Sequence, residues 1–469
     1  MFVKKVNYMD ILIKNGLIIS PPMEFFGDVY INNGKIELVG ENINKPAQKV
    51  IDASDKYIIP GGIDVHTHLD MPYGNIKSRD DFHTGTIAAA FGGTTFIIDF
   101  PTQQKGEKLE TTFMRWFEKS ESKSNIDYSY HMIITDPDVL DEDDFNFLVE
   151  KGITSIKIFT AYPDRLMLND KQIFNLMKIA KRYNLLVLVH AENGIIIDEL
   201  VKFAISRGYK EPKYHAFSRP EIMEAEAVNR VISYAMLLDV PIYVVHVSSY
   251  EALRVIKSFR ERKNDVLAET CPQYLFLSID DISRGNEDDY KYIFTPPVRE
   301  KWNQNFLWDA LKDNSLQVLS TDHCPFNFDD KLLGKEDFTK IPNGAPVIEH
   351  RLELSFNGVK QNKISLNRWV EINSTNPAKI FGLFPQKGVI KVGSDADVVI
   401  WNPNVKRIIS HKTHHMNVDY SLFEGMEVFG KAEVVISRGV TLIENDQFVG
   451  EMGQGRFIKR REFSMNSLD

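Results

Sequence analysis

The chain has 469 residues, of which 43% are hydrophobic and 26% charged, and its formal net charge is −9. This composition is typical of a globular protein with a large core, and the negative charge argues against nucleic-acid binding. The two cysteines, Cys271 and Cys324, exclude a disulfide framework and favour a reducing, cytoplasmic compartment. We find no signal-peptide core and no apolar run near the roughly 20 residues that span a bilayer, so we expect no membrane association.

The two ends of the chain share a pattern of short strands separated by turns. Near the N-terminus, strand-like segments are broken by turn signals such as Asn15-Gly16, which is typical of antiparallel β structure. The same pattern of short strand-like segments returns at residues 397–401. We therefore predict a small β-sandwich domain formed by residues 1–58 and 385–450, followed by a C-terminal tail at 451–469.

Residues 59–384 have a different rhythm, in which short β-branched runs alternate with longer helical patterns. Such alternation indicates parallel βαβ units in an α/β fold. Eight runs match the strand number of a (β/α)8 TIM-like barrel, with an open doubly wound sheet as the alternative. The runs are residues 59–68, 94–100, 128–135, 155–159, 185–190, 242–247, 266–270 and 317–322. The helices expected between them include residues 81–91, 109–120, 169–183, 220–238 and 250–262.

Residue types that bind metals recur where these runs end. A hydrophobic core alone would not need polar residues at these positions. In a (β/α)8 barrel the C-terminal ends of the strands converge on one shallow bowl. His66 and His68, at positions i and i+2 of the first run, point to the same side and can reach one cation. Each histidine alone would more often be a hydrogen-bonded core residue, but their joint occurrence predicts a shared metal site. The six candidate ligands are His66, His68, Lys157, His190, His246 and Asp322.

Lys157 interrupts an otherwise apolar strand, Ile156-Lys157-Ile158-Phe159. Burial and positive neighbours both lower the pKa of a lysine, and a neutral amine can add CO2 to form a carbamate. N6-carboxylation would turn Lys157 into an anionic bridge between two divalent cations, whereas the alternative is a lysine paired with a nearby acid. The ligand types favour Zn2+ and leave Mn2+, Co2+ and Ni2+ open. Such a site activates water and polarises a carbonyl, which favours hydrolysis of a stable amide.

Several blocks of the sequence resemble the amidohydrolase superfamily and, within it, the dihydropyrimidinase and D-hydantoinase family. The resemblance spans nearly the whole chain. It implies hydrolytic ring opening of a cyclic amide, a 5,6-dihydropyrimidine or a 5-substituted hydantoin, to an N-carbamoyl amino acid by a homotetramer, as in pyrimidine degradation. The matching blocks are Pro60-Gly61-Gly62-Ile63-Asp64-Val65-His66-Thr67-His68, Phe91-Gly92-Gly93-Thr94-Thr95, Val189-His190-Ala191-Glu192-Asn193, Ser320-Thr321-Asp322-His323-Cys324-Pro325-Phe326, Ile341-Pro342-Asn343-Gly344 and Thr413-His414-His415-Met416-Asn417-Val418-Asp419-Tyr420.

The resemblance also implies roles for individual residues. Asp322 would take the proton of the attacking hydroxide and pass it to the leaving ring nitrogen, as general acid/base chemistry requires. The hydroxyl of Tyr162 would stabilise the developing oxyanion. Tyr162 and the backbone near Thr295 and Asn343 would hold the substrate, although the family usually has serine where this chain has Thr295. The implied metal ligands are His66, His68 and Asp322 for one ion, His190 and His246 for the other, and carboxylated Lys157 for both.

Three competing interpretations remain at this point. One is an allantoinase or another cyclic ureide hydrolase with the same machinery. Another is a non-catalytic scaffold resembling the collapsin response mediator proteins, which share the fold but have lost metal ligands; retention of all six ligand-type positions and Tyr162 argues against it. The third, a nucleophilic Cys324 beside His323, is disfavoured because the metal hydroxide already fills that role. Asp70 stands where dihydroorotases carry an arginine, so a neutral ring is favoured over dihydroorotate.

Overall fold

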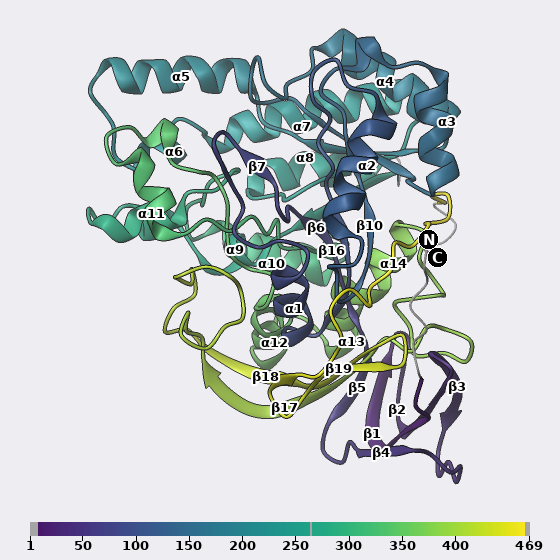
Figure 1. Cartoon of the computed structure of the whole chain (residues 1–469). Helices are drawn as coiled ribbons and strands as arrows, with labels where there is room; N and C mark the ends of the chain where they lie inside the picture. The colour runs from purple at the N-terminus through teal and green to yellow at the C-terminus, as the bar shows by residue number, and fades with distance from the viewer. Residues whose placement is uncertain (1–7, 263–264, 465–469) are drawn as a thin grey trace.

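The computed structural model describes residues 8–262 and 265–464, and its central part is the α/β barrel that the strand and helix pattern predicts (Figure 1). Neighbouring barrel strands pair in parallel. The third strand is interrupted at His131, so that its first half pairs with β9 and its second half with β12. The strands are β6 (Gly62–Thr67), β9 (Thr94–Asp99), β10 (Asp127–Tyr130) with β11 (Met132–Ile133), β12 (Ser155–Phe159), β13 (Leu186–His190), β14 (Ile242–Val244), β15 (Val266–Thr270) and β16 (Val318–Leu319).

Hydrogen bonds join the eighth strand to the first. Thr67, at the end of β6, forms a parallel bridge with His323, which lies just beyond β16. Nearer the N-terminal ends of the same strands, the buried guanidinium of Arg351 donates to Ile63 O at 3.1 Å and to Leu319 O at 2.9 Å. The strand order therefore returns to its start, and the (β/α)8 prediction is confirmed over the open-sheet alternative.

The helices form where the sequence has apolar residues at helical spacing and a polar residue that caps the N-terminus. In α4, Asn169 and Gln172 form a capping box, and the buried Ile173, Leu176 and Ala180 lie on one face at helical spacing. Among the described residues, no helix is long and apolar enough to cross a membrane. The helices are α1 (Thr84–Phe91), α2 (Leu109–Ser120), α3 (Glu142–Lys151), α4 (Asp170–Arg182), α5 (Gly194–Ser206), α6 (Lys213–Phe217), α7 (Glu221–Leu238), α8 (Tyr250–Arg260), α9 (Pro272–Phe276), α10 (Asn303–Lys312), α11 (Phe328–Lys331), α12 (Arg351–Lys360), α13 (Leu366–Val370) and α14 (Asn376–Ile380).

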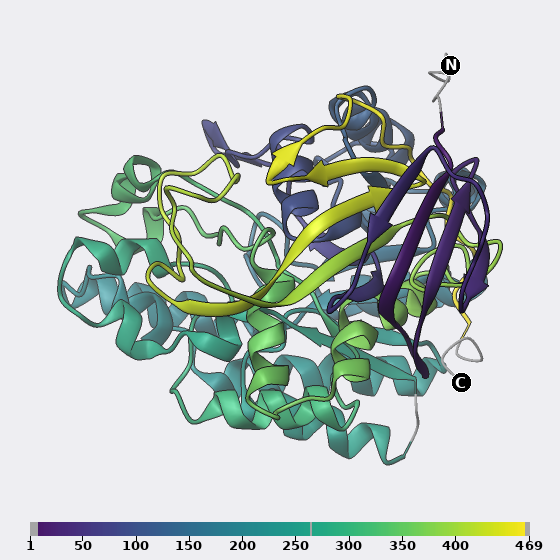
Figure 2. The same ribbon diagram turned by 90° about the horizontal axis from the view of Figure 1, so that it is seen from below.

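The two ends of the chain form one β domain, as the pattern of short strands and turns that they share predicts. Within the described residues, its strands form a nine-stranded sheet in which β5 and β17 pair antiparallel and so join the N-terminal to the C-terminal half. The sheet divides at β1, whose first half pairs with β4 and whose second half pairs with β5. Figure 2 shows the long β17 and β18 running beside the N-terminal strands. The strands are β1 (Ile11–Ser20), β2 (Met23–Asn32), β3 (Lys35–Gly40), β4 (Lys49–Asp52), β5 (Tyr57–Pro60), β17 (Val398–Ile408), β18 (Glu427–Ser437), β19 (Val440–Glu444) and β20 (Gln447–Phe448).

A buried cluster of charges ties this β domain to the barrel. The ammonium of Lys387, 1% exposed, lies 2.8 Å from Asp127 Oδ2 at the start of β10 and 2.6 Å from Asp397 Oδ2 beside β17. Asp127 also accepts from Arg438 Nε at 2.8 Å. Burial alone would lower the pKa of Lys387, but the surrounding carboxylates raise it well above its usual value, so the ammonium stays charged.

Lys387→Met should lower the free energy of unfolding by about 3–5 kcal/mol, because it leaves buried carboxylates without their cation. Chemical denaturation followed by circular dichroism measures this loss. Lys387→Arg keeps the charge and should lose less. An unfolding midpoint of Lys387→Met equal to that of the wild type would contradict a stabilising role for the cluster.

Candidate metal centre and active site

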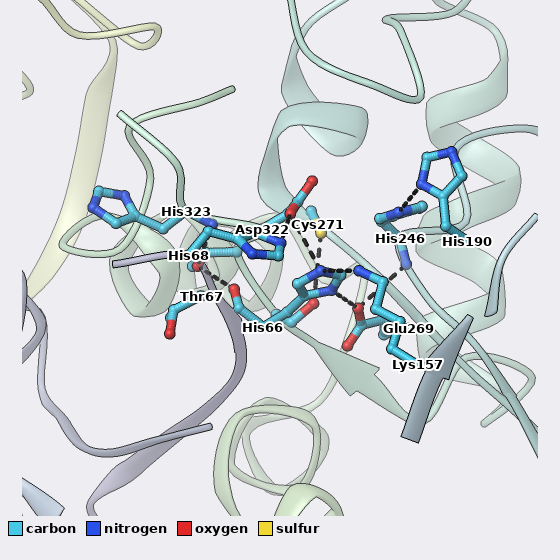
Figure 3. Close-up of polar contacts among 12 residues, drawn as sticks. His66, Thr67, His68, Lys157, His190, His246, Glu269, Cys271, Asp322 and His323 are labelled. Atoms are coloured by element: carbon cyan, nitrogen blue, oxygen red, sulfur yellow. Dashed lines mark hydrogen bonds and ion pairs between the residues drawn. The ribbon is translucent and has the colours of Figure 1, made fainter. Parts of the chain in front are cut away.

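The six predicted ligands meet at the C-terminal ends of the barrel strands (Figure 3). They come from five different strands or the residues just after them, so the barrel brings together positions that are far apart in sequence. Figure 3 shows His66, His68, Lys157 and Asp322 in one group, with His246 and His190 beside it. His66 lies in β6, and His68 is the first residue after that strand. Lys157 lies in β12, and His190 is the last residue of β13. His246 and Asp322 lie in the segments that follow β14 and β16.

Two histidines and one aspartate form the first half of the site. The Nε2 atoms of His66 and His68 each lie 3.2 Å from Asp322 Oδ1. The three possible ligand atoms all lie within 4.8 Å of one another, which fits a single bound cation. Asp322 has a φ of 52°, in the left-handed region that is uncommon for residues other than glycine. The surrounding structure must hold this conformation, as is often the case at functional sites.

The other two histidines form the second half of the site. His190 Nδ1 lies 2.9 Å from His246 Nε2, while His190 Nε2 lies 2.9 Å from Glu192 Oε2. On the first half, His66 Nδ1 lies 2.5 Å from Glu269 Oε1. A carboxylate beside one ring nitrogen holds the proton there, so the other nitrogen presents its lone pair. The nitrogens that face the centre of the site are therefore arranged as metal ligands.

Lys157 lies between the two halves. Its Nζ is 2.9 Å from His66 Nε2 and 4.3 Å from the centre of the Phe100 ring, and the residue is 1% exposed. Burial lowers the pKa of Lys157 to about 8, although Asp322 and Glu269 act in the opposite direction. Across residues 8–262 and 265–464, no carboxylate lies within the 4.0 Å ion-pair distance of its Nζ. This geometry favours a reactive amine over a lysine paired with an acid.

The charges of the site suit metal binding. Burial lowers the pKa values of His66 and His246 well below the usual range, so both rings are neutral at physiological pH. Burial would raise the pKa of Asp322, but the neighbouring His66 and His68 hold it at about 2. Neutral imidazoles and an ionised carboxylate are the forms that bind a divalent cation.

A cavity of about 240 Å³ opens above the predicted ligands. Tyr162, Thr295 and Asn343, the predicted substrate contacts, all line it. Tyr162 has a φ of 64°, and burial raises the pKa of its hydroxyl above the usual range, so it stays protonated and able to donate. The structure therefore places the predicted substrate contacts and the predicted ligands around one space.

Apolar side chains cover much of the cavity wall. Met71 and Tyr73 come from a hairpin of β7 (Pro72–Tyr73) and β8 (Ile76–Lys77), and Phe159 and Leu166 come from the end of β12 and the loop after it. Polar groups line the metal end of the cavity and the segments around Tyr162, and Thr102, Gln104 and Arg115 add polar atoms elsewhere on the wall. An apolar substituent on a small polar ring fits this division.

Glu192 and Glu269 were missed in the sequence analysis. Glu269 lies in β15, where it interrupts the apolar run Val266-Leu267-Ala268 in the same way that Lys157 interrupts its own strand. Glu192 follows His190 by two residues. Both side chains are about 1% exposed and contact a predicted ligand. A buried carboxylate in or just after a barrel strand was the signal that could have identified them.

His323 and Cys324 do not form a nucleophile and base pair. His323 Nε2 lies 3.0 Å from Asp80 Oδ2, and its Nδ1 accepts from Val347 N at 3.1 Å. Both ring nitrogens are therefore engaged away from the thiol. Burial raises the pKa of Cys324 well above the usual range, so its thiol stays protonated. These contacts agree with the expectation that Cys324 is not the nucleophile.

Comparison with known proteins identifies the family of the chain. Residues 57–442 match the amidohydrolase family. The chain is 47% identical to the D-hydantoinase of Geobacillus stearothermophilus, over 98% of each chain, and 38% identical to the dihydropyrimidinase of Rattus norvegicus, over 97% of this chain and 89% of that one. A crystal structure of the dihydropyrimidinase from Brevibacillus agri superposes with a TM-score of 0.95 at 48% identity, covering 97% of this chain and 100% of that one. The chain therefore belongs to the dihydropyrimidinase and D-hydantoinase family of the amidohydrolases.

Proposed function

We propose that the protein opens a cyclic amide by hydrolysis, converting a 5-substituted hydantoin or a 5,6-dihydropyrimidine to the N-carbamoyl amino acid. The observation that carries this proposal is the meeting of four imidazoles, Lys157 and Asp322 at the polar end of one cavity. Relatives named D-hydantoinase and dihydropyrimidinase, which align over nearly the whole chain, support the same reaction.

We propose that the site holds two divalent cations, with Zn2+ favoured. The neutral imidazoles and the ionised carboxylate support this assignment, as do the outer carboxylates of Glu192 and Glu269. When bound, such cations lower the pKa of a water to near 7 and polarise the substrate carbonyl. The proposed ligands are His66, His68 and Asp322 for one ion, His190 and His246 for the other, and N6-carboxylated Lys157 between them.

The chain's own residues then carry the proton and orient the ring. Asp322 Oδ1 contacts both His66 and His68, which leaves Oδ2 to take the proton of the attacking water and return it to the leaving ring nitrogen. The protonated hydroxyl of Tyr162 donates to the carbonyl oxygen as negative charge develops there. The backbone near Thr295 and Asn343 holds the amide edge of the ring, and a threonine in place of serine leaves that backbone in position.

The wall of the cavity favours a hydantoin with an apolar 5-substituent. Met71, Tyr73, Phe159 and Leu166 offer apolar surface, whereas the ureido substituent of allantoin would lose its hydrogen bonds to water there. Retention of every ligand-type position supports catalysis over a scaffold role.

The remaining proposals concern organisation and place in the cell. We propose a domain division into 1–58 with 385–450, 59–384 and 451–469, which the pairing of β5 with β17 supports. Two free, buried cysteines support a cytoplasmic location. Resemblance to the family supports a homotetramer, and the net charge of −9 argues against a nucleic-acid partner.

Lys157→Ala should lower kcat by about a thousandfold or more and reduce the metal content below two ions per chain, because the bridging carbamate is lost. Elemental analysis and steady-state kinetics measure the two effects. Added short-chain carboxylic acids should restore part of the activity by occupying the vacated position, whereas Lys157→Arg should not be rescued. Full turnover by Lys157→Ala without added acid would refute the carbamate.

Tyr162→Phe should lower kcat by about 100- to 1000-fold, the cost of losing one donor to an oxyanion. The metal content should stay at the wild-type value, since Tyr162 is not a proposed ligand. Tyr73→Phe is the matched control, because it removes another tyrosine hydroxyl from the wall of the same cavity. Equal kinetic effects of the two substitutions would argue against a specific role for Tyr162.

Turnover of a substrate panel should separate the candidate rings. We expect kcat/KM to be highest for hydantoins with apolar 5-substituents, lower for dihydrouracil and lowest for allantoin, because the wall of the cavity is apolar. Steady-state assays with equal enzyme and metal loading give the ranking. Allantoin turnover equal to or above that of the hydantoins would overturn the proposed substrate class.

A further inference from the structure

Lys331 is a fully buried lysine outside the metal site. It ends α11, its exposed fraction is 0%, and among the described residues no carboxylate lies within 4.0 Å of its Nζ. Its Nζ instead donates to Ile293 O at 2.7 Å, to Pro342 O at 2.6 Å and to Gly344 O at 2.9 Å. An ammonium has three N–H donors and no acceptor, so its donors match these three carbonyls one to one.

The three carbonyls belong to the two segments that carry the proposed substrate contacts. Ile293 lies two residues before Thr295, while Pro342 and Gly344 flank Asn343. Thr295, Asn343 and Gly344 line the cavity. A backbone hydrogen bond of 3.1 Å from Gly344 N to Ile293 O joins the same segments. The ammonium therefore lies directly behind the backbone that would hold the ring.

The helix that presents this lysine is itself anchored. Asp330 receives two hydrogen bonds from Arg79, with Nε to Oδ2 at 2.7 Å and Nη2 to Oδ1 at 2.5 Å. Phe328 N donates to Asp419 Oδ1 at 2.8 Å. Burial lowers the pKa of Lys331 to about 7, against the effects of Cys324 and Asp330. Hydrogen bonds to three carbonyls act in the opposite direction, because only the ammonium form has a donor for each of them. The position of Nζ is therefore fixed from outside the cavity.

We propose that Lys331 is a positioning residue for substrate binding, whose ammonium sets the spacing between the backbone at Thr295 and the backbone at Asn343. This inference rests on the proposed function. Both segments would contact the ring before and during the reaction, so their displacement weakens ground-state and transition-state binding alike. Loss of such uniform binding raises KM and leaves kcat nearly unchanged.

Lys331→Met should raise KM for a hydantoin substrate by about tenfold, with kcat changed by less than about threefold and an unaltered metal content. Lys331→Arg keeps a cation and should fall between this variant and the wild type. Hydrogen exchange followed by mass spectrometry should show faster exchange in residues 293–296 and 342–345 of Lys331→Met, a result that does not depend on turnover.

Lys387→Met is the matched control, because it removes another buried lysine, one that does not line the cavity. It should lose stability and keep the wild-type KM. A KM of folded Lys331→Met within twofold of the wild type, or an equal rise in Lys387→Met, would overturn the proposal. If Lys331→Met does not fold, Lys331→Arg and Lys331→Gln provide the same comparison.

Absence of wild-type turnover on every cyclic amide would refute the proposed function instead. The hydrogen-exchange measurement would still test whether Lys331 links the two segments.

Discussion

The close approach of basic nitrogens inside the barrel is the constraint on which the site depends. Lys157 Nζ and His66 Nε2 lie 2.9 Å apart, as do His190 Nδ1 and His246 Nε2, and all four side chains are almost fully buried. Burial disfavours the charged forms of His66, His246 and Lys157, so these two rings are kept neutral and the lysine is driven toward the free amine. Nitrogen lone pairs held this close repel one another, so the binding of cations at the proposed metal centre would stabilise the fold around them.

Carboxylates that contact the predicted histidine ligands determine which ring nitrogen of each histidine carries the proton. Glu269 also accepts from the Tyr243 hydroxyl at 2.9 Å, so the carboxylate next to His66 is itself held in place. Burial raises the pKa of Glu269 to about 7, although hydrogen bonds from Ser320 and Tyr243 act against this rise. These outer contacts orient the imidazoles before any ion binds, and preorganisation of this kind reduces the cost of assembling the site.

Much of this architecture could be predicted from the sequence, because it depends on periodic patterns. The expected helix at 109–120 coincides with α2, and the expected helix at 250–262 begins where α8 begins. The interruption of the third strand at His131 had no periodic signal. The buried side chain of His131 contacts Ser155 on the neighbouring strand, and such a contact between distant residues cannot be read from the sequence. Glu192 and Glu269 were missed for a related reason: they are not placed as direct ligands but contact the histidines that are, and such a contact has no spacing in the sequence. Lys331 could not have been identified, because its three acceptors are backbone carbonyls that carry no sequence signal.

The proposed metal ligands and the residues proposed to select the substrate lie on different parts of the fold. The proposed ligands lie on barrel strands or directly after them, where backbone pairing and outer carboxylates fix their positions. Met71, Tyr73 and Leu166 lie on a hairpin and a loop and are only partly buried. A substitution in those segments changes the shape of the cavity wall without moving a ligand, so specificity can vary while the chemistry is retained. The backbone at Thr295 and Asn343 belongs to neither group. It lies in loops, yet Lys331 donates hydrogen bonds to the carbonyls beside both residues. These contacts would keep the proposed amide-binding edge constant while Met71 and Leu166 are free to change.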